Sequence, residues 1–110
     1  MTLLQRMEVA RQAANERLRG ETRKQLEAAL AELLPGATVY LFGSLLKPCQ
    51  FSDVSDVDLA LVEEPAHLSV YQLTSLLAER LGRPVDVLVL AECRFRDRIV
   101  QEGERWTTPG

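Results

Sequence analysis

The sequence predicts an α/β or α+β domain in which one small sheet is flanked by helices. Three short apolar runs, at residues 39–42, 57–62 and 85–90, are typical of strands. Segments with apolar residues at three- and four-residue spacing precede the first run and follow the second and third, and this is the helical period. This order of elements favours a layered architecture around a single sheet.

The chain has the size of one domain. Its 110 residues are 46% hydrophobic and 26% charged, which is the composition of an ordinary globular protein. Within the single domain 1–110 we expect an N-terminal helical segment at residues 1–34, a core at residues 35–102 and a tail at residues 103–110.

Residues 2–34 are predicted to be helical. Apolar residues recur in the first part at helical spacing: Leu3, Met7, Ala10, Ala14 and Leu18. Gly20 interrupts the pattern, which leaves two alternatives, two helices or one long helix with a weak point. Pro35 and Gly36 end the segment. We expect the helix to pack on the core, and its length leaves self-association or partner binding as an alternative.

The remaining elements follow from the same criteria. Residues 44–55 are predicted to form a short helical turn and a loop. Residues 67–81 have the pattern of a helix, which Gly82 and Pro84 end. Residues 92–102 are predicted to form the last helix before the tail.

Three aspartates lie in or next to the predicted strands. Asp56 and Asp58 open the second strand, and residues two apart in a strand share a face. Asp86 lies inside the third strand, so a neighbouring position in the sheet can bring it alongside them. Three carboxylates on one patch repel one another unless a cation lies among them. Hard oxygen ligands of this kind suit Mg²⁺ or Mn²⁺, completed by water and substrate phosphates.

A small group of residues after the first strand could bind phosphate. Gly43 allows the backbone to approach a phosphate closely. Ser44 offers a hydroxyl and, at the start of a helical turn, backbone N–H donors. Lys47 adds a positive charge for a leaving pyrophosphate. Together with the aspartates, these residues predict phosphoryl or nucleotidyl transfer, which depends on positioning and charge neutralisation by two metal ions.

Each candidate has a structural alternative. Asp53 could replace one of the metal-binding aspartates, although a loop or helix-cap role fits its position better. Asp86 could be a structural residue paired with Arg80 or Arg83, because an unpaired buried carboxylate is costly. His67, the sole histidine, fits a surface or capping position better than a catalytic one.

At these residues the chain resembles a known family. Gly43–Ser44, Ser55–Leu59 and Val85–Val87 are similar to the three signatures of the polymerase-beta-like nucleotidyltransferase superfamily. The resemblance covers residues 22–102 and is greatest to the minimal nucleotidyltransferases, small prokaryotic domains that act as antitoxins in HEPN–MNT toxin–antitoxin pairs.

The resemblance implies a specific fold and activity. The fold would be a small mixed sheet flanked by helices, with a long N-terminal helical segment. The activity would be transfer of AMP from ATP to a tyrosine of a partner HEPN toxin, with Mg²⁺ or alternatively Mn²⁺ as cofactor. The implied catalytic and metal-binding residues are Asp56, Asp58 and Asp86, and the implied nucleotide- and phosphate-binding residues are Gly43, Ser44 and Lys47.

The chain departs from the family in the segment after the first strand. The family usually has Gly-Ser-Arg-Ala-Arg-Gly, whereas residues 43–48 here are Gly-Ser-Leu-Leu-Lys-Pro. Lys47 keeps one of the two positive charges. A second hypothesis is therefore a non-catalytic antitoxin that neutralises a HEPN toxin by forming a complex. A third is an adenylyltransferase for a small molecule such as an aminoglycoside, which would need a further domain or subunit to complete the acceptor pocket.

Charge and hydropathy exclude other classes of function. The net charge is −3 without a dense basic run, which argues against strong direct binding of nucleic acid. No apolar stretch has the length needed to span a bilayer, and the N-terminus does not have the pattern of a signal peptide. Cys49 and Cys93 are far apart and are expected to be free thiols in the cytoplasm.

Two further features could concern partners. The alternating arginines at positions 94, 96 and 98 cannot lie on one helix face and are interpreted mainly as solvated, with contact to a partner or an RNA as an alternative. Trp106, in the predicted tail, either anchors an interface or packs back on the domain.

Overall fold

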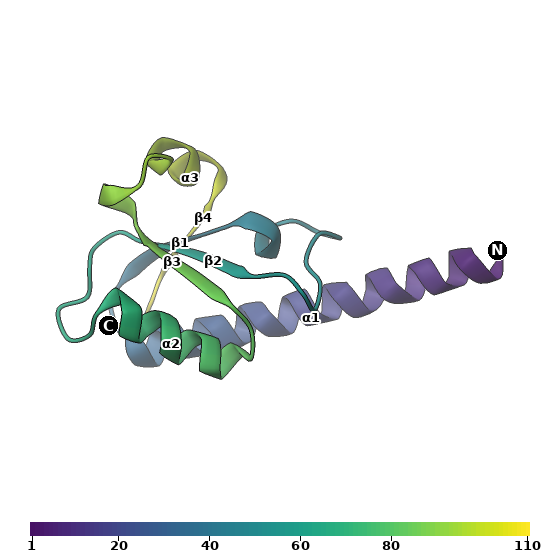
Figure 1. Ribbon diagram of the computed structural model, residues 1–110, viewed down its shortest axis with the longest axis horizontal. Helices are drawn as coiled ribbons and strands as arrows, with labels where there is room; N and C mark the ends of the chain where they lie inside the picture. Colours follow the sequence, from purple (N-terminus) through teal and green to yellow (C-terminus); the bar gives the residue numbers. More distant parts are fainter.

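The computed structural model describes all residues 1–110 and confirms the predicted α/β class with a small mixed sheet flanked by helices (Figure 1). The elements in chain order are α1 (Leu3–Leu33), β1 (Thr38–Phe42), the 3₁₀ helix η1 (Gly43–Leu46), β2 (Val57–Leu61), α2 (Val70–Leu81), β3 (Val85–Val89), the 3₁₀ helix η2 (Leu90–Glu92), α3 (Arg96–Glu102) and β4 (Glu104–Thr107).

The sheet has four strands in the order β3-β2-β1-β4. β1 is antiparallel to both β2 and β4, and β2 is parallel to β3, with α2 connecting the two parallel strands. A parallel pair needs such a crossover connection, whereas β1 and β2 are joined by η1 and a loop. The sheet thus brings the end of β1 next to the starts of β2 and β3.

The fourth strand corrects the prediction that residues 103–110 form a tail. β4 pairs with β1 along the edge of the sheet, with Val39 opposite Trp106 and Tyr40 opposite Arg105. The strand is short and mostly polar, so the sequence has no apolar run that would indicate it. Its pairing depends on the exposed edge of β1, a tertiary feature that local sequence does not report.

α1 is one continuous helix, which decides between the two alternatives raised by Gly20. Its start is fixed by a capping box, in which the Thr2 hydroxyl accepts from the Gln5 N–H and the Gln5 side chain accepts from the Thr2 N–H. A glycine inside a helix costs about 1 kcal/mol relative to alanine, which the long run of good helix formers around it offsets.

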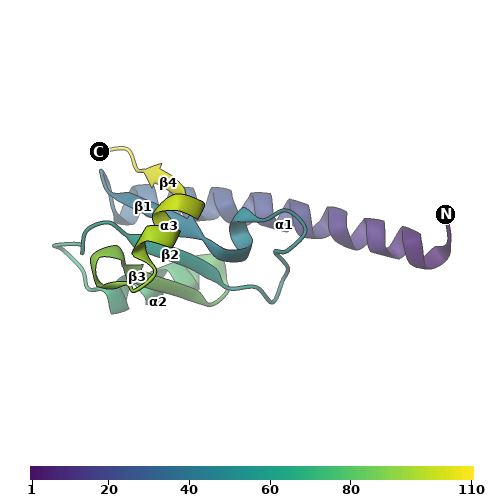
Figure 2. The ribbon, with the colours of Figure 1, turned by 90° about the horizontal axis from the view of Figure 1, so that it is seen from above.

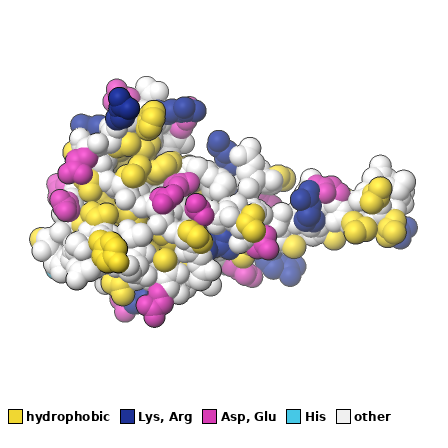
Figure 3. All heavy atoms as spheres, in the orientation of Figure 1, with side chains coloured by type: hydrophobic (Ala, Val, Ile, Leu, Met, Phe, Trp, Pro, Cys, Tyr) yellow, Lys and Arg dark blue, Asp and Glu magenta, His cyan; other side chains and the backbone are white.

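The two parts of α1 have different environments. Residues 3–14 are exposed throughout, and Figure 2 shows this end extending well beyond the sheet. Figure 3 shows apolar side chains among the charges there, and Leu3, Leu4 and Met7 are among the exposed apolar residues. The second part packs on the sheet through its buried residues, Thr22, Leu26, Ala29 and Leu30. The expectation that the helix packs on the core therefore holds for its C-terminal part.

The sheet separates two apolar clusters. The larger one lies between the sheet and the helices α1 and α2, and it includes Leu26, Leu41, Leu59, Leu73 and Leu77. The smaller one lies on the other face, where Ala60 and Leu90 pack against Ile99 of α3. Figure 1 shows α3 and the pair α1–α2 on opposite sides of the sheet. Because α3 is short, this second face is only partly covered.

Helix boundaries differ from the prediction by a few residues. α2 begins at Val70 rather than residue 67, because Ser69 provides a capping box with Gln72. The last helix begins at Arg96 rather than residue 92, since η2 follows β3 first. None of the helices combines the length and the apolar character that crossing a membrane would require.

Candidate functional site

The predicted aspartates meet where β1 ends and where β2 and β3 begin. Asp58 of β2 lies opposite Phe42 of β1 on one side and opposite Asp86 of β3 on the other. Residues opposite one another in a sheet share a face, so these three side chains form a row on the α3 side. Ala60, two residues after Asp58, packs in the cluster under α3, which fixes the face. Asp56 precedes the first residue of β2 by one position.

The electrostatic surroundings of Asp58 include the other two carboxylates. The pKa of Asp58 is raised from 3.8 to about 6, mainly by burial and then by the negative charges of Asp86 and Asp56. Asp58 is half-buried, whereas Asp56 and Asp86 are exposed. The cost of burial that would require a structural partner for Asp86 does not arise, because Asp86 is exposed near the start of the edge strand β3. A half-buried carboxyl group between two others is the kind of perturbed group found at functional sites.

Gly43 makes room for the Asp58 carboxylate. A Cβ atom at this position would lie 2.2 Å from Asp58 Oδ2, well inside van der Waals contact. The backbone at Gly43 also has φ +79°, a left-handed conformation that favours glycine. Two independent constraints therefore require glycine at the residue where β1 turns into η1.

The candidate phosphate-binding residues lie beside this carboxylate. Gly43 and Ser44 begin η1, and the Ser44 carbonyl accepts from the Lys47 N–H at 3.0 Å. Ser44 is half-buried and Lys47 is exposed. The structure therefore brings all six predicted site residues to one end of the sheet or to the turn that follows β1. Their binding roles stay predictions.

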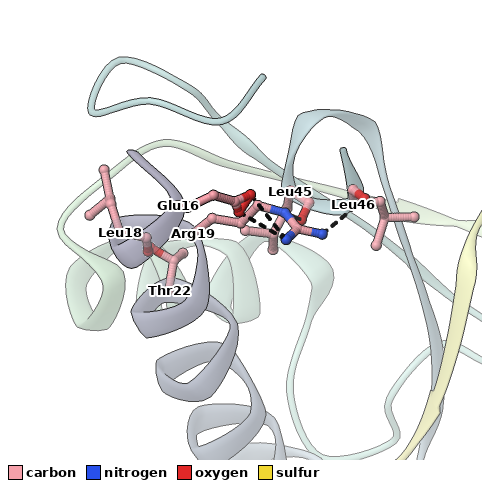
Figure 4. A network of polar contacts seen from close by, with 6 residues as sticks. All are labelled: Glu16, Leu18, Arg19, Thr22, Leu45 and Leu46. Carbon is pink, nitrogen blue, oxygen red and sulfur yellow. Dashed lines mark hydrogen bonds and ion pairs between the residues drawn. The ribbon is translucent and has the colours of Figure 1, made fainter. Parts of the chain in front are cut away.

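η1 is held from behind by α1. Leu45 is fully buried in the larger cluster, so its side chain points away from the candidate site. Arg19 donates from Nε to the Leu45 carbonyl at 2.8 Å and from Nη2 to the Leu46 carbonyl at 3.0 Å. Figure 4 shows this guanidinium between the helix and η1, with Glu16 on its other side. Sequence reasoning missed Arg19, because no local pattern links it to η1.

A hollow next to the carboxylates was also missed. It has a volume of about 460 Å³ and lies between η1, β3 and α3, with Gly43 in its wall. Its lining combines apolar and charged side chains: Phe42, Leu46, Lys47, Leu88, Phe95, Arg98, Ile99 and Glu102. Its lining residues come from η1, β3 and α3, so no local pattern could have indicated it before the packing of these elements was known.

The carboxylates fit a divalent cation by their chemistry and are not arranged as a complete ligand set. No three His, Cys, Asp or Glu side chains converge in a geometry that would hold a metal ion. Burial, followed by the charges of Asp86 and Asp56, nevertheless raises the pKa of Asp58, and a hard cation at this position would stabilise the charged carboxylate. Asp56 and Asp86 are exposed and have space to turn toward a shared ion. Asp56, Asp58 and Asp86 therefore stay the predicted metal ligands.

Two structural alternatives for the carboxylates are not supported. Arg80 pairs with Glu32 at 2.6 Å, and Arg83 donates to the carbonyls of Ser52 and Ser55, so neither arginine pairs with Asp86. Asp53 is exposed and is not among the charges that raise the pKa of Asp58.

Other candidate residues have structural surroundings. His67 lies at the far end of the sheet, where its Nε2 is 2.8 Å from the Leu33 carbonyl oxygen. Trp106 packs back on the domain, with Arg23 stacked 5.4 Å from its ring centroid and its Nε1–H donating to Glu104. The three alternating arginines are exposed, and the last of them, Arg98, also lines the hollow.

Comparison with known proteins agrees with this geometry. Residues 24–106, more than half of the chain, match the family described as Polymerase beta, Nucleotidyltransferase. A chain of a toxin–antitoxin crystallised with AMP-PNP has 25% identity and a TM-score of 0.60, over 77% of this chain and 73% of that one. A chain of the toxin–antitoxin MntA-HepT has 22% identity and a TM-score of 0.52, over 84% of this chain and 73% of that one, and shows the same fold.

No curated protein sequence shows significant similarity to the chain. The resemblance to the minimal nucleotidyltransferases of toxin–antitoxin pairs, predicted from Gly43–Ser44 and the three aspartates, is confirmed by the family match and by the two solved structures. The chain belongs to the polymerase beta nucleotidyltransferase family.

Proposed function

We propose that the protein transfers AMP from ATP to a protein hydroxyl, a tyrosine of a partner HEPN toxin, and thereby acts as the antitoxin. The observation that carries this proposal is the position of Asp58. It lies half-buried beside Asp86 and two residues after Asp56, with a raised pKa, and directly against Gly43 at the start of η1. In a nucleotidyltransferase family member, such a group of carboxylates is best suited to holding metal ions against a nucleotide triphosphate.

Asp56, Asp58 and Asp86 are the residues that would hold Mg²⁺, or Mn²⁺ in its place. Such ions, when bound, would neutralise charge on the triphosphate and on the oxygens that attack and leave. Gly43 lets the phosphates approach the backbone, and Ser44 offers a hydroxyl to a phosphate oxygen. Lys47 is exposed and places a positive charge for the leaving pyrophosphate.

The transfer itself exchanges a phosphoanhydride bond of ATP for a phosphoester bond to the acceptor. The hydroxyl oxygen of the acceptor forms a bond to the α-phosphorus of ATP, the bond from that phosphorus to the bridging oxygen breaks, and pyrophosphate leaves. Asp86, exposed near the start of an edge strand, is the carboxylate open to an approaching acceptor and is proposed to accept the hydroxyl proton.

The choice of nucleotide and partner is supported by the two structural relatives. One is a toxin–antitoxin crystallised with AMP-PNP, an analogue of ATP, and the other is the toxin–antitoxin MntA-HepT. This chain covers 73% of each relative's matched chain. The 110-residue domain has only an open hollow beside its carboxylates, so a large acceptor that brings its own surface suits it better than a small molecule.

A second candidate is an antitoxin that neutralises its partner by forming a complex, without catalysis. The observation that favours it is the orientation of η1. Leu45, at the position where the family usually has an arginine, is fully buried, and Lys47 is the one cationic side chain in residues 43–48. Such a turn would bind a triphosphate more weakly than one that carries two arginines.

The test is incubation of the protein with ATP, Mg²⁺ and the HEPN protein proposed as its partner, followed by mass spectrometry of both chains. The proposal predicts addition of AMP to a tyrosine of the HEPN protein, its absence with Asp56→Asn, and normal addition with Asp53→Asn as the matched control. An unmodified HEPN protein that is nevertheless silenced in a stable complex would reject AMP transfer and favour neutralisation by binding.

A further inference from the structure

The loop between η1 and β2 must hold Asp56 in place without regular secondary structure. Residues 47–56 contain no helix or strand, and Asp56 is the last residue before β2. A loop of this kind is mobile unless its backbone groups have partners. Two arginines from other parts of the fold, Arg83 and Arg19, supply such partners at its two ends.

Arg83 binds the end of the loop that leads into Asp56. Its Nη1 donates to the Ser55 carbonyl at 2.8 Å and to the Ser52 carbonyl at 3.1 Å. These two residues are also bonded to each other, since the Ser55 N–H donates to the Ser52 carbonyl and the Ser52 N–H donates to the Ser55 hydroxyl. One guanidinium therefore fixes a closed turn directly before Asp56.

Asp56 is bracketed by the dipeptide Arg83–Pro84. On its N-terminal side, the carbonyl of Ser55 accepts from the Arg83 side chain. On its C-terminal side, the N–H of Val57 donates to the Pro84 carbonyl at 3.1 Å. Because the backbone on both sides of Asp56 is fixed to the same two residues, the position of the Asp56 carboxylate depends on them.

The surroundings of Arg83 suit a structural clamp rather than an ion pair. Its guanidinium carbon lies 4.6 Å from the centroid of the Phe51 ring, and Phe51 is buried in the core. Arg83 forms no salt bridge, and its buried Nε has no hydrogen-bond partner. The charged donor is thus committed to carbonyl oxygens, and hydrogen bonds from a charged group are stronger than neutral ones.

Arg19 binds the chain just before the start of the loop, also through hydrogen bonds to backbone carbonyls. Its guanidinium donates to the carbonyls of Leu45 and Leu46, the last residues of η1, where no further helical turn satisfies them. Figure 4 shows that this arginine comes from α1, behind η1. The turn that carries Gly43 and Ser44 is therefore tied to the long helix.

We propose that Arg83 and Arg19 are positioning residues that hold the two ends of the loop at residues 47–56. Arg83 binds the backbone next to Asp56, and Arg19 binds the end of η1. The inference rests on the proposed nucleotidyl transfer for its effect on catalysis. The clamp itself is a property of the protein without nucleotide and can be measured independently.

The test compares Arg83→Met, which keeps the stem over Phe51 and removes the donors, with Arg83→Lys and with the control Arg80→Met. Arg80 is the matched arginine, because it makes an exposed ion pair with Glu32 away from the loop. Amide hydrogen exchange is read at Ser52, Ser55 and Val57, well below each variant's Tm. We expect Arg83→Met to accelerate exchange at these amides by about tenfold or more, Arg83→Lys to retain part of the protection and Arg80→Met to retain it fully.

Catalysis gives a second readout on the same proteins. Arg83→Met should lower kcat for AMP transfer by about tenfold or more and raise the Mg²⁺ concentration needed for half-maximal rate, with partial rescue in Arg83→Lys. Arg19→Met should accelerate exchange at the Lys47 amide, which is bonded to Ser44, and should raise KM for ATP.

Three results would overturn the proposal. These are loop exchange in Arg83→Met equal to that of the wild type, an increase spread evenly over the whole chain, or a normal kcat in a variant whose loop exchanges faster. If the wild type transfers no AMP, the proposed function fails, while the exchange measurement still decides whether the two arginines clamp the loop.

Discussion

The two ends of the sheet differ in a way that identifies the functional one. Each end is hollowed and carries carboxylates. At one end a hollow of about 410 Å³ is bordered by Glu63, Glu64 and His67. At the other a hollow of about 460 Å³ has Gly43 in its wall, and Gly43 in turn lies against Asp58. Glu63 and Glu64 are exposed in the turn after β2, and His67 bonds to a helix-end carbonyl.

The number of carboxylates therefore does not distinguish the two ends. Asp58 is distinguished by register and burial, because the strands fix it next to Asp86 and the sheet partly removes it from water. Gly43 adds a third constraint, since its missing side chain leaves the space that the Asp58 carboxylate occupies. A carboxyl group whose charged form is disfavoured by its surroundings is typical of a site that binds a cation or moves a proton.

The largest expected difference in kcat between the two ends of the sheet comes from neutralising one carboxylate at each end. Asp58→Asn should lower kcat for AMP transfer by about a thousandfold or more, because one of the proposed ligands of the metal ions would be lost. Glu64→Gln should leave kcat unchanged. Steady-state rates of both variants, with Tm as a check on folding, would measure the difference. Equal rates for the two variants would contradict the assignment.

A glycine exchange at each end separates steric from backbone effects. Gly43→Ala should lower kcat by about a hundredfold, because the new methyl group would displace the Asp58 carboxylate. Gly36→Ala, at the other end, has a similar φ of +73° and only an ordinary contact at 3.5 Å, so it should cost about 1–2 kcal/mol of stability and no activity. Comparable losses of activity in the two variants would show that strain, not contact with Asp58, is responsible.

The raised pKa of Asp58 predicts a pH dependence of stability in the absence of divalent metal. Asp58 binds its proton more tightly in the folded state than in the unfolded state. Its contribution to the free energy of unfolding is therefore fully present below about pH 4 and is lost as the pH rises through about 6. We expect a loss on the order of 1 kcal/mol, because the group is half in contact with solvent and is screened. Denaturant unfolding at pH 4 and pH 7 should show the loss in wild type and not in Asp58→Asn.

The other titrating carboxylates serve as the internal reference for that comparison. Arg11, Arg80 and Arg23 lower the pKa values of Glu8, Glu32 and Glu104, and this acts in the opposite direction in both proteins. The loss of unfolding free energy between pH 4 and pH 7 therefore reports on Asp58 only as the difference between wild type and Asp58→Asn. A loss of equal size in both would exclude Asp58 as its source.

The smallest expected effect is that of Asp53→Asn. Asp53 is exposed, three positions before Asp56, and makes no contribution to the raised pKa of Asp58. Neutralising an exposed charge in a loop should change kcat by less than about twofold, because solvent screens it. A loss comparable with that of Asp56→Asn would show that the loop presents a different aspartate to the metal ions.

Much of the site could be predicted from sequence because its main residues belong to strands. The period of two in residues 56–58 places both carboxylates near the start of β2, and the apolar run around Asp86 places that residue in β3. Parallel pairing of β2 with β3 then brings Asp58 and Asp86 together. Local patterns of this kind survive folding because each one buries its own apolar face.

The parts that could not be predicted depend on contacts between distant segments. β4 has no apolar run and exists because the edge of β1 is free to pair with it. Whether Gly20 breaks the first helix depends on the balance between the cost of a glycine and the helix propensity of the residues on both sides, and the apolar spacing does not report this balance. The bonds from Arg83 and Arg19 to loop carbonyls join residues that are 26 to 31 positions apart, so no spacing rule reports them.

The most direct measurement is calorimetric titration of the wild type, Asp58→Asn and Glu64→Gln with AMP-PNP, each with and without Mg²⁺. If the aspartate end of the sheet is the nucleotide site, the wild type and Glu64→Gln will bind AMP-PNP with the same Kd in a Mg²⁺-dependent manner, and Asp58→Asn will bind at least about tenfold more weakly. Equal binding by all three proteins, or binding that does not depend on Mg²⁺, would contradict the assignment of Asp58 and its neighbours as the metal and nucleotide site.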